Sequence, residues 1–153
     1  MAEIVIRTPQ ASDVDELVTN LRQADVDELR AWGTTDIRGC VASALERSVV
    51  ARTGTADGRV GCVFGVTPLT LLGDVGVPWM LGTDLVVKHQ RVLMRRCRPY
   101  IQDMLFLYPH LINFVHAGNS AAFRRLKCVG FSLQPAVPMA PFGELFHRFD
   151  LEV

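Results

Sequence analysis

The chain has 153 residues, of which 49% are hydrophobic and 21% are charged, a composition that favours an ordered globular protein and excludes intrinsic disorder. Lysine and arginine together number 16, as do aspartate and glutamate, so net charge gives no reason to expect nucleic acid or an anionic membrane as partner. No segment approaches the roughly 18 consecutive apolar residues of a membrane span.

The four cysteines lie at positions 40, 62, 97 and 128, without the short spacings that bind zinc or perform redox chemistry. The N-terminus carries an acid at position 3 and only three consecutive apolar residues, unlike a signal peptide. We therefore expect a single domain over residues 1–153, located in the cytoplasm of the cell that makes it.

The N-terminal third predicts one strand and three helices. Residues 3–8 alternate and are rich in β-branched side chains, which indicates a strand stopped by Pro9. The expected helices are one capped by Ser12 with Asp15 in a capping box, one starting near Asp25, and one capped by Thr34 or Thr35 and ending near Arg47. The pentapeptide Asp-Val-Asp-Glu-Leu opens the first two helices, where early acids favour a helix N-terminus.

The rest of the chain predicts a sheet with two more helices. The expected strands are 48–53, 59–68, 77–87 and 111–115, with residues 54–58 as a hairpin loop and two C-terminal strands around Gly143. The expected helices are 86–106, broken or kinked near Pro99, and 120–128. Gly82 interrupts the apolar central strand, as a glycine does at a bulge or at a close approach of two backbone segments.

One motif lies at the end of this pattern, where an apolar strand, a turn, a helix and Gly-Phe follow one another. Counted from Asn119, the residues at offsets of three, seven, eleven and twelve are Ala122, Leu126, Gly130 and Phe131. The spacing and the element order resemble the GNAT-type N-acetyltransferase fold, whose members often carry Asn, Ala, Tyr and Gly-Phe at these offsets. The resemblance implies an α+β fold in which a mixed, mostly antiparallel sheet is flanked by helices, and the strands ending near Val87 and Val115 are parallel neighbours that splay apart.

Two further stretches carry a second resemblance. The segments Pro-Trp-Met-Leu-Gly-Thr at 78–83 and Tyr-Pro-His-Leu-Ile-Asn-Phe-Val at 108–115 resemble a small GNAT-like family encoded by short-tailed bacteriophages. Some members of that family are called internal virion or morphogenesis proteins. This resemblance implies a phage origin, a role in assembly with phage structural proteins or further copies of the chain, and association with the virion.

The GNAT resemblance also implies a site for acetyl-coenzyme A, to which Gly82, Val87, Lys88, Arg91, Arg95 and Asn119 correspond. Active enzymes of this type have a loop Gln/Arg-x-x-Gly-x-Gly/Ala after the central strand, whose backbone amides cradle the pyrophosphate. Residues 87–96 contain no glycine, so the backbone cannot approach a phosphate as closely. Lys88, Arg91, Arg95 and Arg98 share a helical face, which either holds phosphate by charge or is a solvated or docking face.

Candidate catalytic groups are few. Acetylation of an amine needs a base for the ammonium proton and a donor for the acetyl carbonyl. The candidates are Asp84 as base, His116 as the best-placed titratable imidazole and the Gly82 amide at a strand bulge as donor. The alternatives are a helix cap for Asp84 and a structural role for His116. Leu126 replaces the tyrosine that usually protonates the thiolate.

Two functions follow from these observations. The first is a binding or assembly protein with a degenerate coenzyme site, which requires no cofactor. The second is an acetyl-coenzyme A-dependent N-acetyltransferase with a divergent pyrophosphate loop. In the first case the basic face is expected to dock on an acidic partner, or on acids of the N-terminal helices in another copy, namely Asp13, Asp15, Asp25, Asp27 and Glu28. A second basic cluster, Arg124, Arg125 and Lys127, is interpreted as a solvated helix face.

Overall fold

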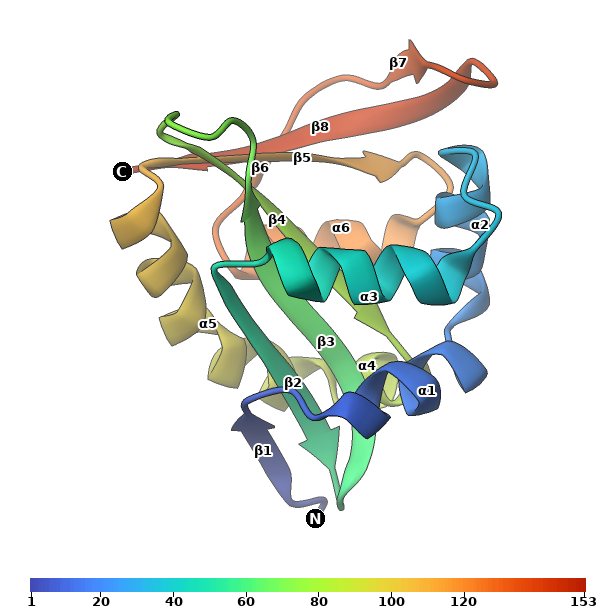
Figure 1. Cartoon of the computed structure of the whole chain (residues 1–153), viewed down its shortest axis with the longest axis vertical. Coiled ribbons are helices and arrows are strands. Elements are labelled where there is room, and N and C mark those ends of the chain that lie inside the picture. The colour runs from blue at the N-terminus through green and yellow to red at the C-terminus, as the bar shows by residue number, and fades with distance from the viewer.

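The computed structural model describes residues 1–153 as one sheet with six helices (Figure 1). The strands are β1 Ile4–Arg7, β2 Val50–Ala56, β3 Arg59–Pro68, β4 Val75–Gly82, β5 His110–His116, β6 Ser132–Leu133, β7 Val137–Met139 and β8 Glu144–Glu152. The helices are α1 Ala11–Thr19, α2 Gln23–Ala31, α3 Ile37–Arg47, α4 Asp84–Lys88, α5 Gln90–Leu107 and α6 Ser120–Cys128. None of the helices is both long enough and apolar enough to cross a bilayer.

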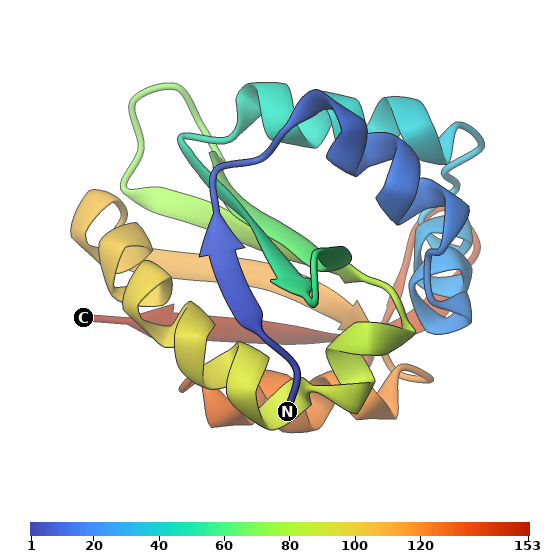
Figure 2. The ribbon, with the colours of Figure 1, turned by 90° about the horizontal axis from the view of Figure 1, so that it is seen from below.

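The sheet is mixed and mostly antiparallel, as the sequence predicts. Its strand order is β1-β2-β3-β4-β5-β8-β6, with β7 also paired to β8. Only the pair β4 and β5 is parallel, because α4 and α5 form the long crossover that parallel neighbours require. In the view of Figure 2 the sheet lies between α1 and α3 on one side and α5 and α6 on the other. The α+β fold class is confirmed.

Each face of the sheet has its own hydrophobic core. The larger cluster packs α5 and α6 against the sheet and includes Phe64, Leu93, Met104 and Leu111. The smaller cluster lies under α1 and α3 and includes Leu17 and Val41. The two clusters follow from the alternation of side chains along β3 and β4, because successive residues of a strand point to opposite faces.

The N-terminal helices begin at other residues than the sequence predicts. The capping box of α1 uses Gln10 and Asp13 in place of Ser12 and Asp15. Asp36 caps α3 in place of a threonine, accepting from the Gly39 backbone N–H at 3.0 Å. In both helices an acidic side chain close to the expected cap accepts a hydrogen bond from a backbone N–H of the first turn. A sequence pattern alone does not show which of several neighbouring polar residues does so.

The β2–β3 hairpin is tighter than predicted, because β2 continues to Ala56. Asp57 and Gly58 form the two-residue turn and have φ values of 51° and 79°. A two-residue turn with positive φ at both residues matches the right-handed twist of the two strands that it joins, and Asp-Gly is a preferred sequence for such a turn. The register irregularity of this hairpin lies between Gly54 and Thr55.

The predicted strand 77–87 is too long, since β4 ends at Gly82 and Thr83 caps the short helix α4. The predicted bulge at Gly82 is also wrong, because β4 keeps an unbroken register with β3 from Gly76 to Gly82. The glycine instead permits a close approach, since a Cβ there would lie 2.6 Å from Val86 Cγ1. Helix α5 continues through Pro99, which is exposed, so water can replace the backbone hydrogen bond that proline removes.

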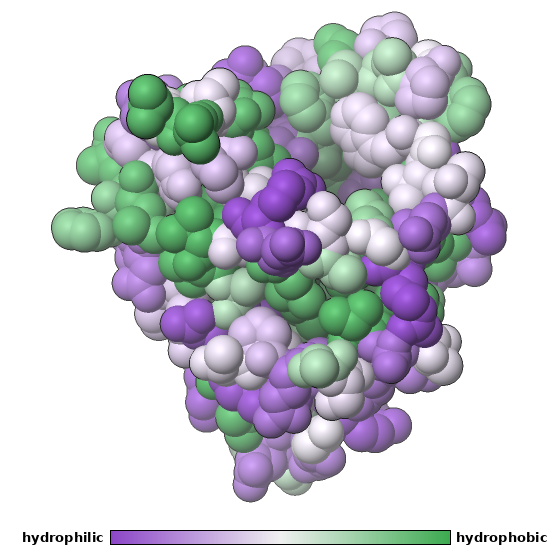
Figure 3. Space-filling view, in the orientation of Figure 1, coloured by the Kyte–Doolittle hydropathy of each residue, from purple (hydrophilic) through white to green (hydrophobic).

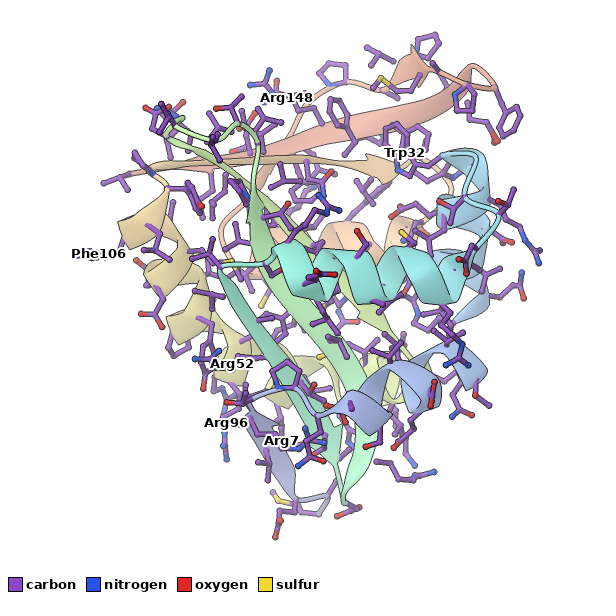
Figure 4. All side chains as sticks on the ribbon, in the orientation of Figure 1. Arg7, Trp32, Arg52, Arg96, Phe106 and Arg148 are labelled. Atoms are coloured by element: carbon purple, nitrogen blue, oxygen red, sulfur yellow. The ribbon has the colours of Figure 1, made fainter.

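One end of the molecule exposes apolar side chains. Leu71 and Leu72, in the loop between β3 and β4, are 94% and 96% exposed, and Phe106 near the end of α5 is 89% exposed. Figure 3 shows apolar surface at the upper left, over this loop, and Figure 4 shows Phe106 pointing outward from α5. Large exposed apolar side chains at one end of a molecule are typical of a surface that contacts another molecule.

Candidate functional site

The central feature of the sheet is a gap between β4 and β5. These strands pair only at Val75 with His110 and at Gly76 with Leu111, and then diverge (Figure 1). Beyond the last pair a single side chain connects them, because Asn113 Nδ2 donates to the Pro78 carbonyl at 2.7 Å. The predicted parallel, splayed strands are therefore present, and the open ends of both strands point toward α2 and the start of α6.

The backbone of β4 leaves hydrogen-bonding groups open toward this gap. The Pro78 carbonyl faces β5, and the Gly82 N–H and carbonyl also point away from β3, toward α2. Because backbone groups alternate along a strand, the N–H and carbonyl of Met80 face the gap as well. Neither group is paired with β5, so an extended ligand can form strand-like hydrogen bonds with Met80.

A cavity of about 260 Å³ occupies the gap and reaches both faces of the sheet. Twenty of its 27 lining residues are hydrophobic, so its walls favour an apolar ligand or ligand segment. From the α2–α3 side the lining includes Leu29, Trp32, Val41 and Trp79, and from the α5–α6 side it includes Met94, Cys97, Ile101, Ala122 and Leu126. Trp32 lies between α2 and β8 (Figure 4), with its ring 4.1 Å from that of Phe146.

Polar groups gather where the cavity meets α2. Asp25 is 4% exposed, and both of its oxygens accept hydrogen bonds, Oδ2 from the Gly82 N–H at 2.8 Å and Oδ1 from Arg22 Nη1 at 3.3 Å. Burial raises the pKa of Asp25, although these two partners oppose the rise. Asp25 thus connects α2 to the end of β4 and has no free oxygen for a ligand.

Glu28, one turn further along α2, is held differently. Its Oε1 accepts from the His116 backbone N–H at 2.7 Å and from Asn119 Nδ2 at 3.4 Å, whereas its Oε2 accepts no hydrogen bond from the protein. Burial raises the pKa of Glu28, and the nearby Asp25 charge contributes to the rise. A cavity-lining carboxylate with a raised pKa and one free oxygen is a suitable general base.

Helix α6 adds two buried side chains with unpaired polar atoms. Asn119 is 5% exposed and its Oδ1 has no partner, and Arg125 is 7% exposed and its Nη1 has no partner. Both residues line the cavity. Burial lowers the pKa of Arg125, and the positive charge of Arg22 adds to the effect. The prediction that Arg125 belongs to a solvated face is therefore wrong, because only Arg124 and Lys127 of that cluster are exposed.

The predicted catalytic side chains lie outside the cavity. Asp84 is exposed on α4, in its first turn but not at its cap. The His116 ring contacts Glu144 Oε1 at 3.1 Å and accepts from the Gly118 N–H at 3.0 Å, and it does not line the cavity. The Gly82 N–H, predicted to face the acetyl oxygen, donates to Asp25 instead. His116 contributes through its backbone, which positions Glu28.

The predicted coenzyme residues are divided between two places. Asn119 lines the cavity, whereas Val87, Lys88, Arg91 and Arg95 are exposed on α4 and α5. Residues 83–117 are without a positive φ, so the backbone after β4 forms helices and not a nest of converging amides. The groups on α4 and α5 that can hold a pyrophosphate are therefore the cationic side chains of Lys88, Arg91 and Arg95. Arg98, the fourth member of the basic face, donates to the Cys128 carbonyl at the end of α6.

The predicted acidic docking face is wrong for three of its five members. Asp13 and Asp25 are buried, and Glu28 lies in the cavity wall. Asp13 accepts from Arg7 twice, from the Gln10 N–H and from Thr53. Only Asp15 and Asp27 are exposed, so the charge available for head-to-tail association is smaller than the sequence indicates.

Sequence reasoning missed Glu28 and Arg125 as site residues. Asp25, Glu28 and Trp32 recur at three- and four-residue spacing, and so do Asn119, Ala122, Arg125 and Val129. This periodicity places a charged residue on the same helical face as apolar core residues. A charged residue at a position where the helical periodicity places core residues was the sequence signal that could have identified Glu28 and Arg125.

Comparisons with known proteins agree with this geometry. No protein-family model matches the sequence, and no curated protein has significant similarity to it. Among solved structures, a ribosomal-protein-alanine N-acetyltransferase from Brucella melitensis has a TM-score of 0.71 at 15% identity, covering 97% of this chain and 99% of that one. A ribosomal L7/L12 alpha-N-protein acetyltransferase in complex with coenzyme A has a TM-score of 0.68 at 10% identity, covering 98% and 94%. A GNAT-family acetyltransferase from Streptococcus pneumoniae has a TM-score of 0.63 at 11% identity, covering 99% and 100%. The fold is therefore that of GNAT acetyltransferases.

Proposed function

We propose that this chain is an N-acyltransferase that uses acetyl-coenzyme A. The observation that carries the proposal is the cavity between β4 and β5, which combines an apolar wall, unpaired strand backbone and the free oxygen of Glu28. Structurally similar proteins include one in complex with coenzyme A and one with acetyl-coenzyme A. A protein that served only as a scaffold would gain nothing from keeping a partly unpaired carboxylate in an apolar cavity.

The thioester arm of the coenzyme would enter from the α5–α6 side. Met80 would form the strand-like hydrogen bonds to its amide groups, and the Met80 N–H is the β4 amide nearest the centre of the gap that is free to polarise a carbonyl oxygen. Lys88, Arg91 and Arg95 would hold the pyrophosphate by charge. When bound, the coenzyme supplies the activated acyl group.

The acceptor amine would enter from the α2–α3 side. Glu28 Oε2 takes a proton from the ammonium group, so the neutral amine can attack the acyl carbon while the carbon–sulfur bond breaks. Oε1 stays bonded to the His116 N–H, which fixes the carboxylate. Leu126 cannot protonate the departing thiolate, and neither tyrosine lines the cavity, so the second proton, which the nitrogen loses as the amide forms, passes through water to the sulfur.

A second candidate is a binding or assembly protein that needs no coenzyme, as the resemblance to phage virion proteins implies. Two observations favour it. The Gly82 N–H is already bonded to Asp25, and Leu71, Leu72 and Phe106 expose an apolar surface suited to a protein partner. In this case the cavity would be a remnant of an older active site, and the partner would be another copy of the chain or a virion protein.

Calorimetric titration with acetyl-coenzyme A separates the two functions. The acyltransferase requires saturable binding with one coenzyme per chain, and a thiol-release assay with a panel of amines should then show turnover. A Glu28→Gln variant should bind coenzyme like the original chain but release thiol far more slowly. Absence of binding at millimolar coenzyme would refute the acyltransferase and favour the assembly protein.

A further inference from the structure

Two residues of the cavity wall carry buried, unpartnered polar atoms of opposite kind. Arg125 Nη1 is a buried donor without an acceptor, and Asn119 Oδ1 is a buried acceptor without a donor. Each residue is more than nine-tenths buried, and buried polar atoms normally have partners. A ligand that completed both atoms would have to present an acceptor and a donor to the same cavity.

Helix α6 brings these atoms to one wall. Asn119, Ala122 and Arg125 follow one another at three-residue spacing, so they project from one face of the helix. Ala122 between them leaves space, since its side chain ends at Cβ. Asn119 Nδ2 already bonds Glu28, so its unpaired Oδ1 lies beside the carboxylate that has one free oxygen.

The charges around the cavity select among simple ligands. Asp25 and Arg22 are joined by a hydrogen bond. Glu28 and Arg125 attract each other electrostatically but share no hydrogen bond, so Glu28 Oε2 and Arg125 Nη1 each lack a partner. A plain amine would satisfy Glu28 and leave Arg125 without an acceptor. A plain carboxylate would satisfy Arg125 and leave Glu28 Oε2 without a donor, so either ligand leaves one polar atom of the cavity wall unpaired.

We infer that the acceptor is a small zwitterion, an apolar α-amino acid, whose carboxylate binds Arg125 and whose ammonium group binds Glu28 and Asn119 Oδ1. The side chain of the amino acid lies against the apolar wall on the α2–α3 side, formed by Leu29, Trp32, Val41 and Trp79. This inference rests on the proposed acyltransferase function and specifies its acceptor. Arg125 is then a specificity-determining residue for the carboxylate.

The test measures binding by calorimetry with matched ligands, with and without saturating coenzyme A. L-leucine and L-phenylalanine are compared with 3-methylbutylamine and 2-phenylethylamine, which lack the carboxylate, and with 4-methylpentanoate, which lacks the amine. Loss of a charge-assisted hydrogen bond to a buried arginine should weaken binding roughly tenfold to a hundredfold. Both amino acids should therefore bind at least about tenfold more tightly than either partial ligand.

Two variants locate the carboxylate. Arg125→Met keeps much of the side-chain volume and removes the guanidinium, so it should bind leucine and 3-methylbutylamine with equal affinity. Arg124→Met, on the exposed side of α6, should keep the original preference. If Arg125→Met fails to fold, the ratio between leucine and 3-methylbutylamine in the original chain decides alone.

Two results would overturn the inference. One is equal affinity of the original chain for leucine and 3-methylbutylamine, and the other is an unchanged preference in a folded Arg125→Met. If coenzyme A binds but no amino acid does, the acceptor inference fails while the proposed function stands. If amino acids bind with the expected preference but coenzyme A does not, the binding site is correct and the acyltransferase is refuted.

Discussion

Replacing Glu28 by glutamine separates the catalytic and structural roles of this carboxylate. The glutamine carbonyl oxygen can still accept from the His116 N–H at the position now 2.7 Å away, so the contact between α2 and β5 should persist. The variant cannot accept a proton. Positioned general bases contribute roughly 10²–10⁴-fold to rate, and we expect kcat to fall within that range with little change in the affinity for coenzyme.

The alanine variant provides the structural control. Glu28→Ala leaves the His116 N–H and Asn119 Nδ2 without their acceptor, and loss of hydrogen bonds to a charged group costs about 1.5–3 kcal/mol. We therefore expect Glu28→Ala to lower the free energy of unfolding by about 2 kcal/mol. Glu28→Gln should not lower it, because it removes a partly buried charge while retaining the acceptor.

The pH dependence has a defined sign. Burial raises the pKa of Glu28 in the folded chain, so between the unfolded pKa and this higher value the folded state binds more protons than the unfolded state. The contribution of Glu28 to stability is therefore full below the unfolded pKa and is lost as pH rises through the folded pKa. Acyl transfer has the opposite trend, since the base must be ionised, and its rate should rise with pH through the same pKa.

Urea denaturation and thiol release, each measured from pH 4 to 9, check these expectations together. The glutamine variant should lack the rise of rate with pH and should gain stability relative to the original chain at the alkaline end. An unchanged kcat in Glu28→Gln would refute the assignment of the base. A loss of stability equal to that of Glu28→Ala would show that the charge itself stabilises the fold.

Three further predictions concern other parts of the molecule. Burial opposes ionisation of Asp13, but hydrogen bonds from Arg7, Gln10 and Thr53 outweigh it and lower its pKa. In urea denaturation at pH 7, Asp13→Asn should lower the free energy of unfolding by about 2–4 kcal/mol, and this loss should shrink as pH falls through the pKa of Asp13. Gly82→Ala should destabilise the fold by about 1–3 kcal/mol, since the new Cβ would lie 2.6 Å from a valine methyl group, and an unchanged melting temperature would contradict the close approach. A double change of Arg91 and Arg95 to glutamate should weaken acetyl-coenzyme A binding by about tenfold or more at low salt and by less at high salt, with an almost unchanged melting temperature. If the variant and the original chain bind the coenzyme equally well at all salt concentrations, these side chains do not form the phosphate site.

The sequence predicted the fold where local patterns and tertiary structure agree. Helix α6 begins and ends at the predicted residues, because the turn before Ser120 and the Gly-Phe after Val129 are local signals. The hydrophobic run of β4 was recognised, but its end was not. Thr83 caps α4 through its own side chain, and an apolar sequence such as Leu-Val-Val suits a strand or a buried helix equally well.

The site was less predictable for a physical reason. Asp84 and His116 follow strand ends in the sequence, which suggested that both side chains reach the gap, but α4 directs Asp84 to solvent and Glu144 holds the His116 ring outside the cavity. Glu28 and Arg125 become neighbours only after α2 and α6 pack at the open end of the gap. That packing depends on contacts between segments almost 100 residues apart, which no local spacing contains.

The short pairing between β4 and β5 has a mechanical consequence. Since the two strands share only the pairs at Val75 and Gly76, the sheet can flex there like a hinge, with the strands β1 to β4 as one arm and the strands from β5 onward as the other. Gly82 lies six residues beyond Gly76, which is about 20 Å along a strand. A rotation of about 5° at the hinge would then move the end of β4 by nearly 2 Å relative to β5. The Asn113 side chain, bonded to Pro78, resists that rotation, and so does helix α2, which is bonded to the end of β4 through Asp25 and to the end of β5 through Glu28. These contacts together set how wide the gap opens.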